Sequence, residues 1–212
     1  ARAGHPWRPR RGGFLHGPPA RNLGLVIALL AICIFGVATA GERFASIDNA
    51  LTILRLASVT GVVSIGMTFV ILTGGIDLSV GSVIGFTTVF VALAIERWGV
   101  PPLLAFVAIL ALSAAFGAAM GAVIHIFDLP PFIVTLAGVF LARGAGFLLS
   151  TESVPITAPV YSTVSDFALR MPGGGRLTAI AMIMLIVVIG GALLLKLTRF
   201  GANVYAIGGS RT

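Results

Sequence analysis

The sequence predicts an all-α polytopic integral membrane protein with about six transmembrane helices. Of its 212 residues, 58% are hydrophobic and only 10% are charged, and the mean hydropathy is +1.07. A soluble domain carries about 25% charged residues, so this chain has too little polar surface to fold around one water-exposed core. Its long apolar runs are separated by short stretches of Gly, Pro and Asp, which is typical of successive membrane spans.

Six apolar segments are long enough to cross a bilayer core of about 30 Å at about 1.5 Å per residue. They run over residues 23–40, 50–72, 79–95, 103–124, 132–150 and 177–195. Transmembrane β-strands are the alternative, but such strands alternate polar and apolar residues over about ten positions, and these segments do not. We therefore expect one transmembrane domain over residues 23–212, with helix breaks near residues 73–78 and 126–131.

The two ends of the chain carry most of its positive charge. Residues 1–22 are rich in Arg, Gly and Pro without apolar periodicity, which predicts a disordered arm. With six spans, eight of the 14 Lys and Arg residues lie on the side of the two ends and four lie in the opposite loops. This bias predicts that both ends are cytoplasmic and that the loop 151–176 is external. The chain starts at Ala1 and stops at YAIGGSRT, which predicts a fragment truncated at its C-terminus.

Two other readings of the composition are weaker. The net charge of +7 could indicate nucleic-acid binding, but the basic residues flank apolar runs and form no stripe with aromatic partners, so no nucleic acid is expected. The first span ends in ATAG, which resembles a signal-peptide cleavage site, yet its apolar core exceeds the usual 7–15 residues. Cys33 is the single cysteine and lies in an apolar run, which excludes a disulfide within these residues.

The stretch ILTGGIDLSVGS, residues 71–82, breaks the apolar pattern with polar groups at membrane depth. Gly74 and Gly75 can end a helix, and the side chains of Asp77 and Ser79 can cap the next one. A carboxylate at the centre of a span costs about 2.5–3.5 kcal/mol, so it usually faces a partner or a water-filled cavity. Two interpretations stay open: a segment that lines or supports a solute path, and a plain interfacial turn.

Further polar positions allow both functional and structural readings. Asp128 and the pair Pro130–Pro131 form the second break, for which a turn suffices, and His125 is expected to be a cap or loop residue. Arg143 lies inside the fifth span, where it could snorkel, pair with an acid or face a pore. Two G-x-x-x-G pairs, at 81/85 and 117/121, favour close helix packing.

Motifs of catalysis and of nucleotide or metal binding are missing from the sequence. It contains no G-x-x-x-x-G-K-[ST], no H-E-x-x-H and no Ser/His/Asp cluster, and Lys196 is its single lysine. An enzyme is therefore not expected. The loop 151–176 contains several prolines and the run 173–175 of glycines, so we expect irregular structure there with one short helical turn around 162–170.

Three blocks of sequence together resemble a known family. GMTFVILTGGIDLSVGSVIGF, PPFIVTLAGVFLARG and TRFGANVYAIGGSRT are similar to the permease subunits of sugar-type ABC importers, in the ribose/galactose branch. The stretch STESVPITAPVYSTVSDFALRMPGGGRLTA looks most like the permease of the galactofuranose importer. The resemblance covers residues 23–212, and the basic arm and the early C-terminal stop depart from it.

This resemblance implies partners and a mechanism. Such permeases pair with a second permease subunit in the bacterial inner membrane, bind a cytoplasmic ABC ATPase that uses ATP and Mg, and receive sugar from a periplasmic binding protein. No cofactor is expected on this chain. The resemblance places the block 74–81 near the translocation path, and the candidates for that path are Thr73, Gly74, Gly75, Asp77, Ser79 and Thr135. It assigns the coupling to the ATPase to Tyr205, Ala206, Ile207, Gly208, Gly209, Ser210 and Arg211.

Two other functions remain possible on the sequence. A proton-coupled secondary carrier could use Asp77, Asp128 and Arg143 as a relay, and its uptake would collapse with an uncoupler but survive ATP depletion. A non-transporting scaffold would show no substrate-dependent flux.

Overall fold

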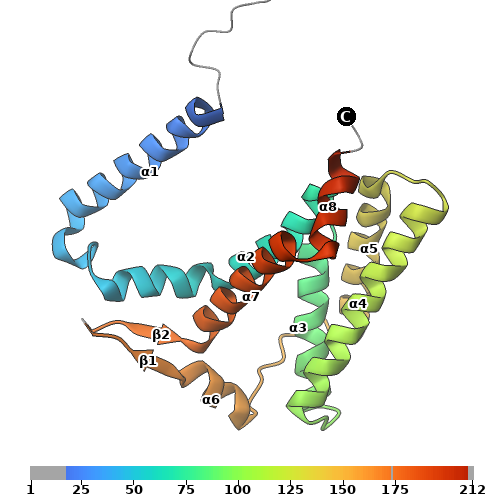
Figure 1. The fold of residues 1–212 in the computed structure, drawn as a ribbon. Coiled ribbons are helices and arrows are strands. Elements are labelled where there is room, and N and C mark those ends of the chain that lie inside the picture. The colour runs from blue at the N-terminus through green and yellow to red at the C-terminus, as the bar shows by residue number, and fades with distance from the viewer. Residues whose placement is uncertain (1–17, 173, 210–212) are drawn as a thin grey trace, which may run out of the picture.

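The computed structural model describes residues 18–172 and 174–209, with side chains from residue 23 onward. Over these ranges the chain forms eight α-helices, one 3₁₀ helix and one two-stranded sheet (Figure 1). The long helices are α1 (Pro18–Ala40), α2 (Ile47–Leu72), α3 (Val80–Glu96), α4 (Pro102–Ile126), α5 (Pro131–Leu149) and α7 (Ala179–Leu197). Each of the six predicted spans is therefore a helix, with ends shifted by five residues or fewer.

Within the described residues, five of these helices are long and apolar enough to cross a membrane, and α3 is a shorter apolar helix of 17 residues. Most of their large apolar side chains are exposed, including Leu148 at 90% and Leu103 at 75%. A helix that is hydrophobic around its whole circumference requires an apolar solvent. The predicted all-α polytopic membrane fold is confirmed. The predicted arm overlaps the start of α1, since that helix begins at Pro18, and residues 1–17 lie outside the described residues.

The helices pack in two groups. α3 lies between α4 and α5, and α2 packs along α7, where Gly61 and Gly191 let the two helices approach closely. α1 contacts mainly the 3₁₀ helix η2 (Gly41–Arg43) and extends away from both groups (Figure 1). The core is small, with Ala105 and Ala181 fully buried. Neither predicted G-x-x-x-G pair packs against another described residue, because a Cβ at any of the four glycines would meet nothing within 4 Å.

The long loop after α5 is more ordered than the sequence predicted. It holds the short helix α6 (Pro159–Asp166) and an antiparallel hairpin of β1 (Ala168–Arg170) and β2 (Arg176–Thr178). The helical turn expected at 162–170 thus starts earlier, and its last residues form a strand. Three-residue strands carry no period-two pattern, so this hairpin had no signal in the sequence.

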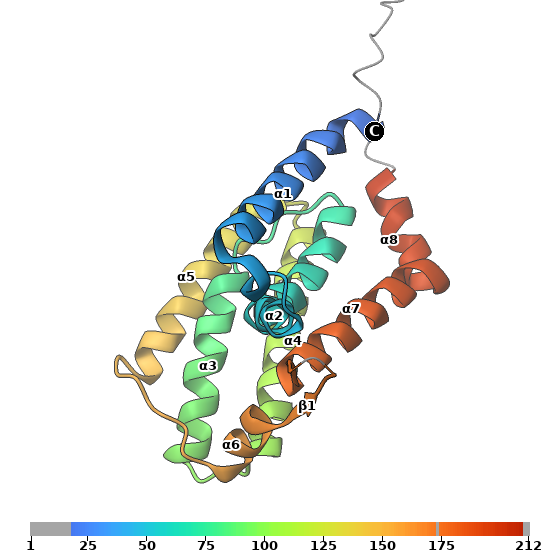
Figure 2. The same cartoon turned by 90° about the vertical axis from the view of Figure 1, so that its left-hand side faces the viewer.

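The loop and the C-terminal helix lie at opposite ends of the molecule. In two perpendicular views, α6 and the hairpin lie at one end, whereas α8 (Arg199–Gly209) and the start of α1 lie at the other (Figures 1 and 2). Six consecutive spans require both ends of the chain on one side of the membrane and the loop after the fifth span on the other, and this arrangement agrees with that.

Candidate functional site

The end of α2 is a helix stop built on two glycines. Thr73 is its last capping residue, and Gly74 follows with a φ of 75°, a conformation that glycine adopts without strain. The amide of Gly74 donates to the carbonyl of Ile71 over 2.9 Å, and the amide of Gly75 donates to Val70 over 3.0 Å. This pair of bonds is a Schellman motif, which satisfies carbonyls that would otherwise have no partner. The break predicted at 73–78 is therefore confirmed and extends to residue 79.

Asp77 organises the start of α3. Its Oδ1 accepts a hydrogen bond from the amide of Ser79 over 2.8 Å and another from the Ser79 hydroxyl over 2.6 Å. Neither predicted side-chain cap forms on α3 itself, because Ser79 is the N-cap residue and its hydroxyl bonds back to Asp77. A carboxylate that accepts two hydrogen bonds is tolerated at membrane depth far better than a bare one.

Thr135, the fifth residue of α5, ties that helix to the break. Its hydroxyl donates to the carbonyl of Ile76 over 3.2 Å, across 59 residues of sequence, and also lies 3.3 Å from its own-helix carbonyl at Phe132. Thr135 is only 4% exposed and Ser79 only 1% exposed. Three predicted path residues therefore lie together at the break. Asp77 bonds to the buried Ser79, and the buried Thr135 bonds to the carbonyl that precedes Asp77, and we call them the Asp77–Ser79–Thr135 cluster.

The other predicted path residues, Thr73, Gly74 and Gly75, form the end of α2 and are not part of the cluster. The Thr73 hydroxyl donates to the carbonyl of Val70 over 2.8 Å, inside its own helix end, and Gly74 and Gly75 shape the backbone. Asp77 is partly exposed, so it joins the buried cluster to the surface of the break. That these residues line a sugar path stays a prediction.

The second break ends α4 in a similar way, with Asp128 in the left-handed conformation that Gly74 adopts after α2. Asp128 has a φ of 50°, and the amide of Leu129 donates to the carbonyl of Ile124 over 3.2 Å. Pro131 then starts α5 at its first turn, where proline loses no helical hydrogen bond. The geometry supports the turn interpretation of this segment. His125 is exposed in the last turn of α4.

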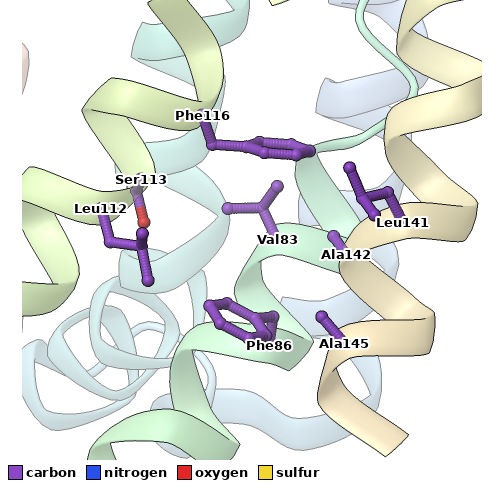
Figure 3. A pocket seen from close by; sticks show the side chains of 8 residues that line it. All are labelled: Val83, Phe86, Leu112, Ser113, Phe116, Leu141, Ala142 and Ala145. Atoms are coloured by element: carbon purple, nitrogen blue, oxygen red, sulfur yellow. The ribbon is translucent and has the colours of Figure 1, made fainter. Parts of the chain in front are cut away.

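An apolar cavity of about 130 Å³ lies between α3, α4 and α5. Figure 3 shows Val83, Phe86, Phe116 and Leu141 pointing into it, with the hydroxyl of Ser113 at one side. A sugar needs several hydrogen-bond partners, and each unpaired hydroxyl in an apolar site is unfavourable. This cavity is therefore unsuited to a sugar.

The predicted coupling residues form part of the amphipathic helix α8. Its buried face is made by Gly201 and Val204, whereas Tyr205 and Ile207 are each 51% exposed and Ala206 is exposed as well. The hydroxyl of Thr198 accepts from the amide of Gly201 over 3.2 Å and so caps the helix after a one-residue bend. Gly208 and Gly209 are described at its end, and Ser210 and Arg211 lie outside the described residues.

α8 contacts the end of α2 directly. The ring of Phe200 lies 6.0 Å from that of Phe69, and Gly208 lies against the backbone of Leu72 and Thr73. The helix that the sequence singled out for coupling is thus packed beside the break that holds Asp77. Neither contact carried a sequence signal, because both depend on how α7 turns into α8.

Glu96 holds the loop after α5 in place, a role that had no signal in the sequence. Its carboxylate, at the end of α3, accepts hydrogen bonds from the amide and hydroxyl of Thr157 over 2.6 and 2.9 Å, and from the amide of Ala158 over 3.3 Å. Ala158 is the N-cap residue of α6, so the carboxylate fixes the chain just before this helix to the end of α3. Among the described residues, no group of three His, Cys, Asp or Glu side chains could hold a metal ion.

The fold and these breaks define a class: a multi-pass helical membrane protein with polar helix interruptions. Residues 49–212 match the family described as the permease component of the branched-chain amino acid transport system, and the chain belongs to this family of transport permeases. Such a component is a transport subunit and no catalytic enzyme. No solved structure shows a significant match.

Several curated permeases are similar to the chain. The inner membrane ABC transporter permease protein YjfF of Escherichia coli is 49% identical over 91% of this chain and 59% of its own length. The fructose import permease protein FruG of Bifidobacterium longum is 35% identical over 96% of the chain and 61% of its own. The ribose import permease protein RbsC of Escherichia coli is 37% identical over 90% of the chain and 58% of its own length. The chain therefore spans about three fifths of the length of these relatives.

Proposed function

We propose that the protein is the membrane-spanning permease subunit of an ATP-driven importer for a monosaccharide, in the bacterial inner membrane. The observation that carries this proposal is the similarity to import permeases over nearly the whole chain. The family description names branched-chain amino acids, whereas two of these relatives carry the names of fructose and ribose import proteins. We propose galactofuranose as the sugar, which rests on the resemblance of residues 150–179 alone.

Transport requires partners that supply energy and substrate. We propose a second permease subunit, a cytoplasmic ABC ATPase that uses ATP and Mg, and a periplasmic sugar-binding protein. The exposed face of α8, with Tyr205 and Ile207, offers the apolar contact area that an ATPase needs. With the N-terminus in the cytoplasm, α8 lies on the side of the ATPase, and α6 with the hairpin faces the binding protein (Figure 1).

The cluster Asp77–Ser79–Thr135 supports alternating access in this proposal. Its three hydrogen bonds join the break after α2 to the start of α3 and to α5. Helices joined at a break can move as a unit when a neighbouring helix moves. Movement of α8, which touches the end of α2, would then shift α3 and α5 together.

Uptake by the full-length protein with its neighbouring transport genes tests this function. Labelled galactose in its furanose form, ribose, fructose and xylose are offered to cells, with ATP depleted in one arm and an uncoupler added in the other. We expect uptake of one sugar that ends with ATP depletion. Uptake that survives ATP depletion but stops with the uncoupler would support the proton-coupled carrier instead. Reporter fusions before residue 18 and after residue 209 test the cytoplasmic location of both ends.

A further inference from the structure

A second polar feature lies beside the buried cluster. A groove of about 400 Å³ runs along α3 and α5, from Leu78 in the break to Ser150 at the end of α5. Its lining includes small residues such as Gly85 and Gly146, and its polar side chains are those of Ser82, Arg143 and Ser150. The volume falls within the range of about 300–1,000 Å³ that is typical of small-molecule sites.

Arg143 is the unusual group in this groove. It lies inside α5, six residues before the helix ends at Leu149, and it is exposed. Its guanidinium lies 5.9 Å from the ring centroid of Phe147, and among the described residues it has no hydrogen bond or ion pair. Charged groups within a span almost always face a partner or a water-filled cavity, because exposure to lipid is costly.

The chemistry of the groove suits a neutral sugar. A guanidinium offers five N–H donors in a fixed plane, which hydroxyl groups of a sugar can accept. The hydroxyl of Ser82 can donate and accept, and the exposed ring of Phe147 offers an apolar face to the C–H side of a sugar ring. No carboxylate lines the groove, so its cation is left for a ligand.

The groove is also continuous with the break. Leu78 lines it and directly follows Asp77, so the groove starts where the polar cluster ends. The buried hydroxyls of Ser79 and Thr135 are already bonded to protein groups, whereas those of a passing sugar need partners on an open face. The cluster therefore holds the helices, and the groove offers the open surface.

We infer that the α3–α5 groove is a water-filled part of the sugar path, in which Arg143 donates hydrogen bonds to the hydroxyl groups of the sugar. This inference rests on the proposed function and adds the surface that the substrate touches. A groove covered by lipid or by a partner helix is the competing arrangement, and it would exclude water from Ser82.

Cysteine labelling tests the inference in the full-length permease, assembled with its partners in a background without cysteine, in which Cys33→Ser removes the one in this chain. Ser82→Cys lies in the groove, and Ile84→Cys, two residues on along the same helix, does not line it. Two membrane-impermeant methanethiosulfonates, one anionic and one cationic, are the probes. We expect Ser82→Cys to react about tenfold faster than Ile84→Cys and to prefer the anionic probe, because a nearby guanidinium attracts anions.

Variants of Arg143 supply the second readout. Arg143→Gln should abolish the preference for the anionic probe and raise the KM of uptake about tenfold, since a hydrogen bond from a charged donor is lost. Arg143→Lys keeps the charge and should keep the preference. Equal, slow labelling of both cysteines would overturn the inference, as would an Arg143→Gln protein with unchanged probe preference and KM. In either case ATP-driven uptake by the Cys33→Ser protein would leave the proposed function standing.

Discussion

Gly208 lies directly against the carbonyl oxygen of Leu72, so the end of α8 touches the last residue of α2 without any side chain between them. A Cβ built at position 208 would collide with that carbonyl, and it would also approach the Cα of Thr73 to 3.8 Å. A second contact between the two helices lies at the start of α8, where the rings of Phe69 and Phe200 are 6.0 Å apart. Any displacement of α8 therefore acts on the backbone just before the break.

Gly208→Ala should loosen the coupling between ATP hydrolysis and uptake. The added methyl group must push α8 off the end of α2, because the atom it meets belongs to the backbone and cannot rotate away. We expect the sugar transported per ATP hydrolysed to fall several-fold in proteoliposomes. The adjacent Gly209→Ala is the control, since a Cβ there meets nothing within 4 Å. Equal transport ratios in the two variants would show that the contact plays no part in coupling.

Thr135→Val should weaken the tie between α5 and the first break. Valine keeps the shape of the side chain but removes the donor, and the carbonyl of Ile76 is left with one partner fewer. A lost buried hydrogen bond costs about 1–2 kcal/mol, which should lower the melting temperature in detergent by a few degrees. Thr68→Val is the matched control, because that hydroxyl bonds only within its own helix, to Ser64 over 2.7 Å. A melting temperature that changes equally in both variants would contradict the tie.

The variant Asp77→Asn distinguishes two roles of Asp77, as a structural hydrogen-bond acceptor or as a carrier of protons. Asparagine keeps a side-chain oxygen that can accept from the amide and hydroxyl of Ser79, but it cannot titrate. We expect Asp77→Asn to retain most uptake and Asp77→Ala to lose several-fold more, because alanine leaves both donors of Ser79 without an acceptor. If both variants abolish uptake equally at normal membrane levels, the carboxylate acts through its charge or its proton.

The six long helices and both breaks could be predicted from the sequence, because each depends on local signals, whereas the helix α8 at the end of the chain was not predicted. Apolar run length sets the spans, and the Gly74–Gly75 pair and Pro131 set their ends. The short hairpin of β1 and β2 could not be predicted, since its stability comes from pairing across the turn at Gly174.

The site was predictable in part. Asp77 and Ser79 come from one sequence block and Thr135 from another, and the structure brings the three residues together. The burial of Ser79 and Thr135 follows from the packing of α3 on α5, which no local pattern encodes. The contact of Gly208 with Leu72 and the hydrogen bonds of Glu96 to Thr157 join residues far apart in the chain. Such contacts depend on tertiary geometry, and a single sequence gives no measure of it.

Substitutions at the two helix breaks, Gly74→Ala and Asp128→Gly, should change the melting temperature in different ways. Gly74 has a φ of 75° and Asp128 a φ of 50°, and a residue with a Cβ is strained by about 1–2 kcal/mol in this region. Gly74→Ala should therefore lower the melting temperature, whereas Asp128→Gly should raise it or leave it unchanged. Thermal unfolding of the purified protein in detergent measures both. If Gly74→Ala raised the melting temperature, a Cβ at position 74 would not strain the end of α2.

Glu96→Ala should release the segment before α6, which we propose to be external. The carboxylate accepts three hydrogen bonds from Thr157 and Ala158, so its loss frees the N-terminus of α6 and the chain that leads to it. We expect limited proteolysis of intact, outward-facing vesicles to cut near residues 151–158 several-fold faster. Glu152→Ala is the control in the same loop, because that carboxylate makes an ion pair with Arg97 at 4.0 Å that is exposed and weak. If both variants are cut at the wild-type rate, α6 is held by other contacts, of which the stacking of Tyr161 on Phe106 is the next to test.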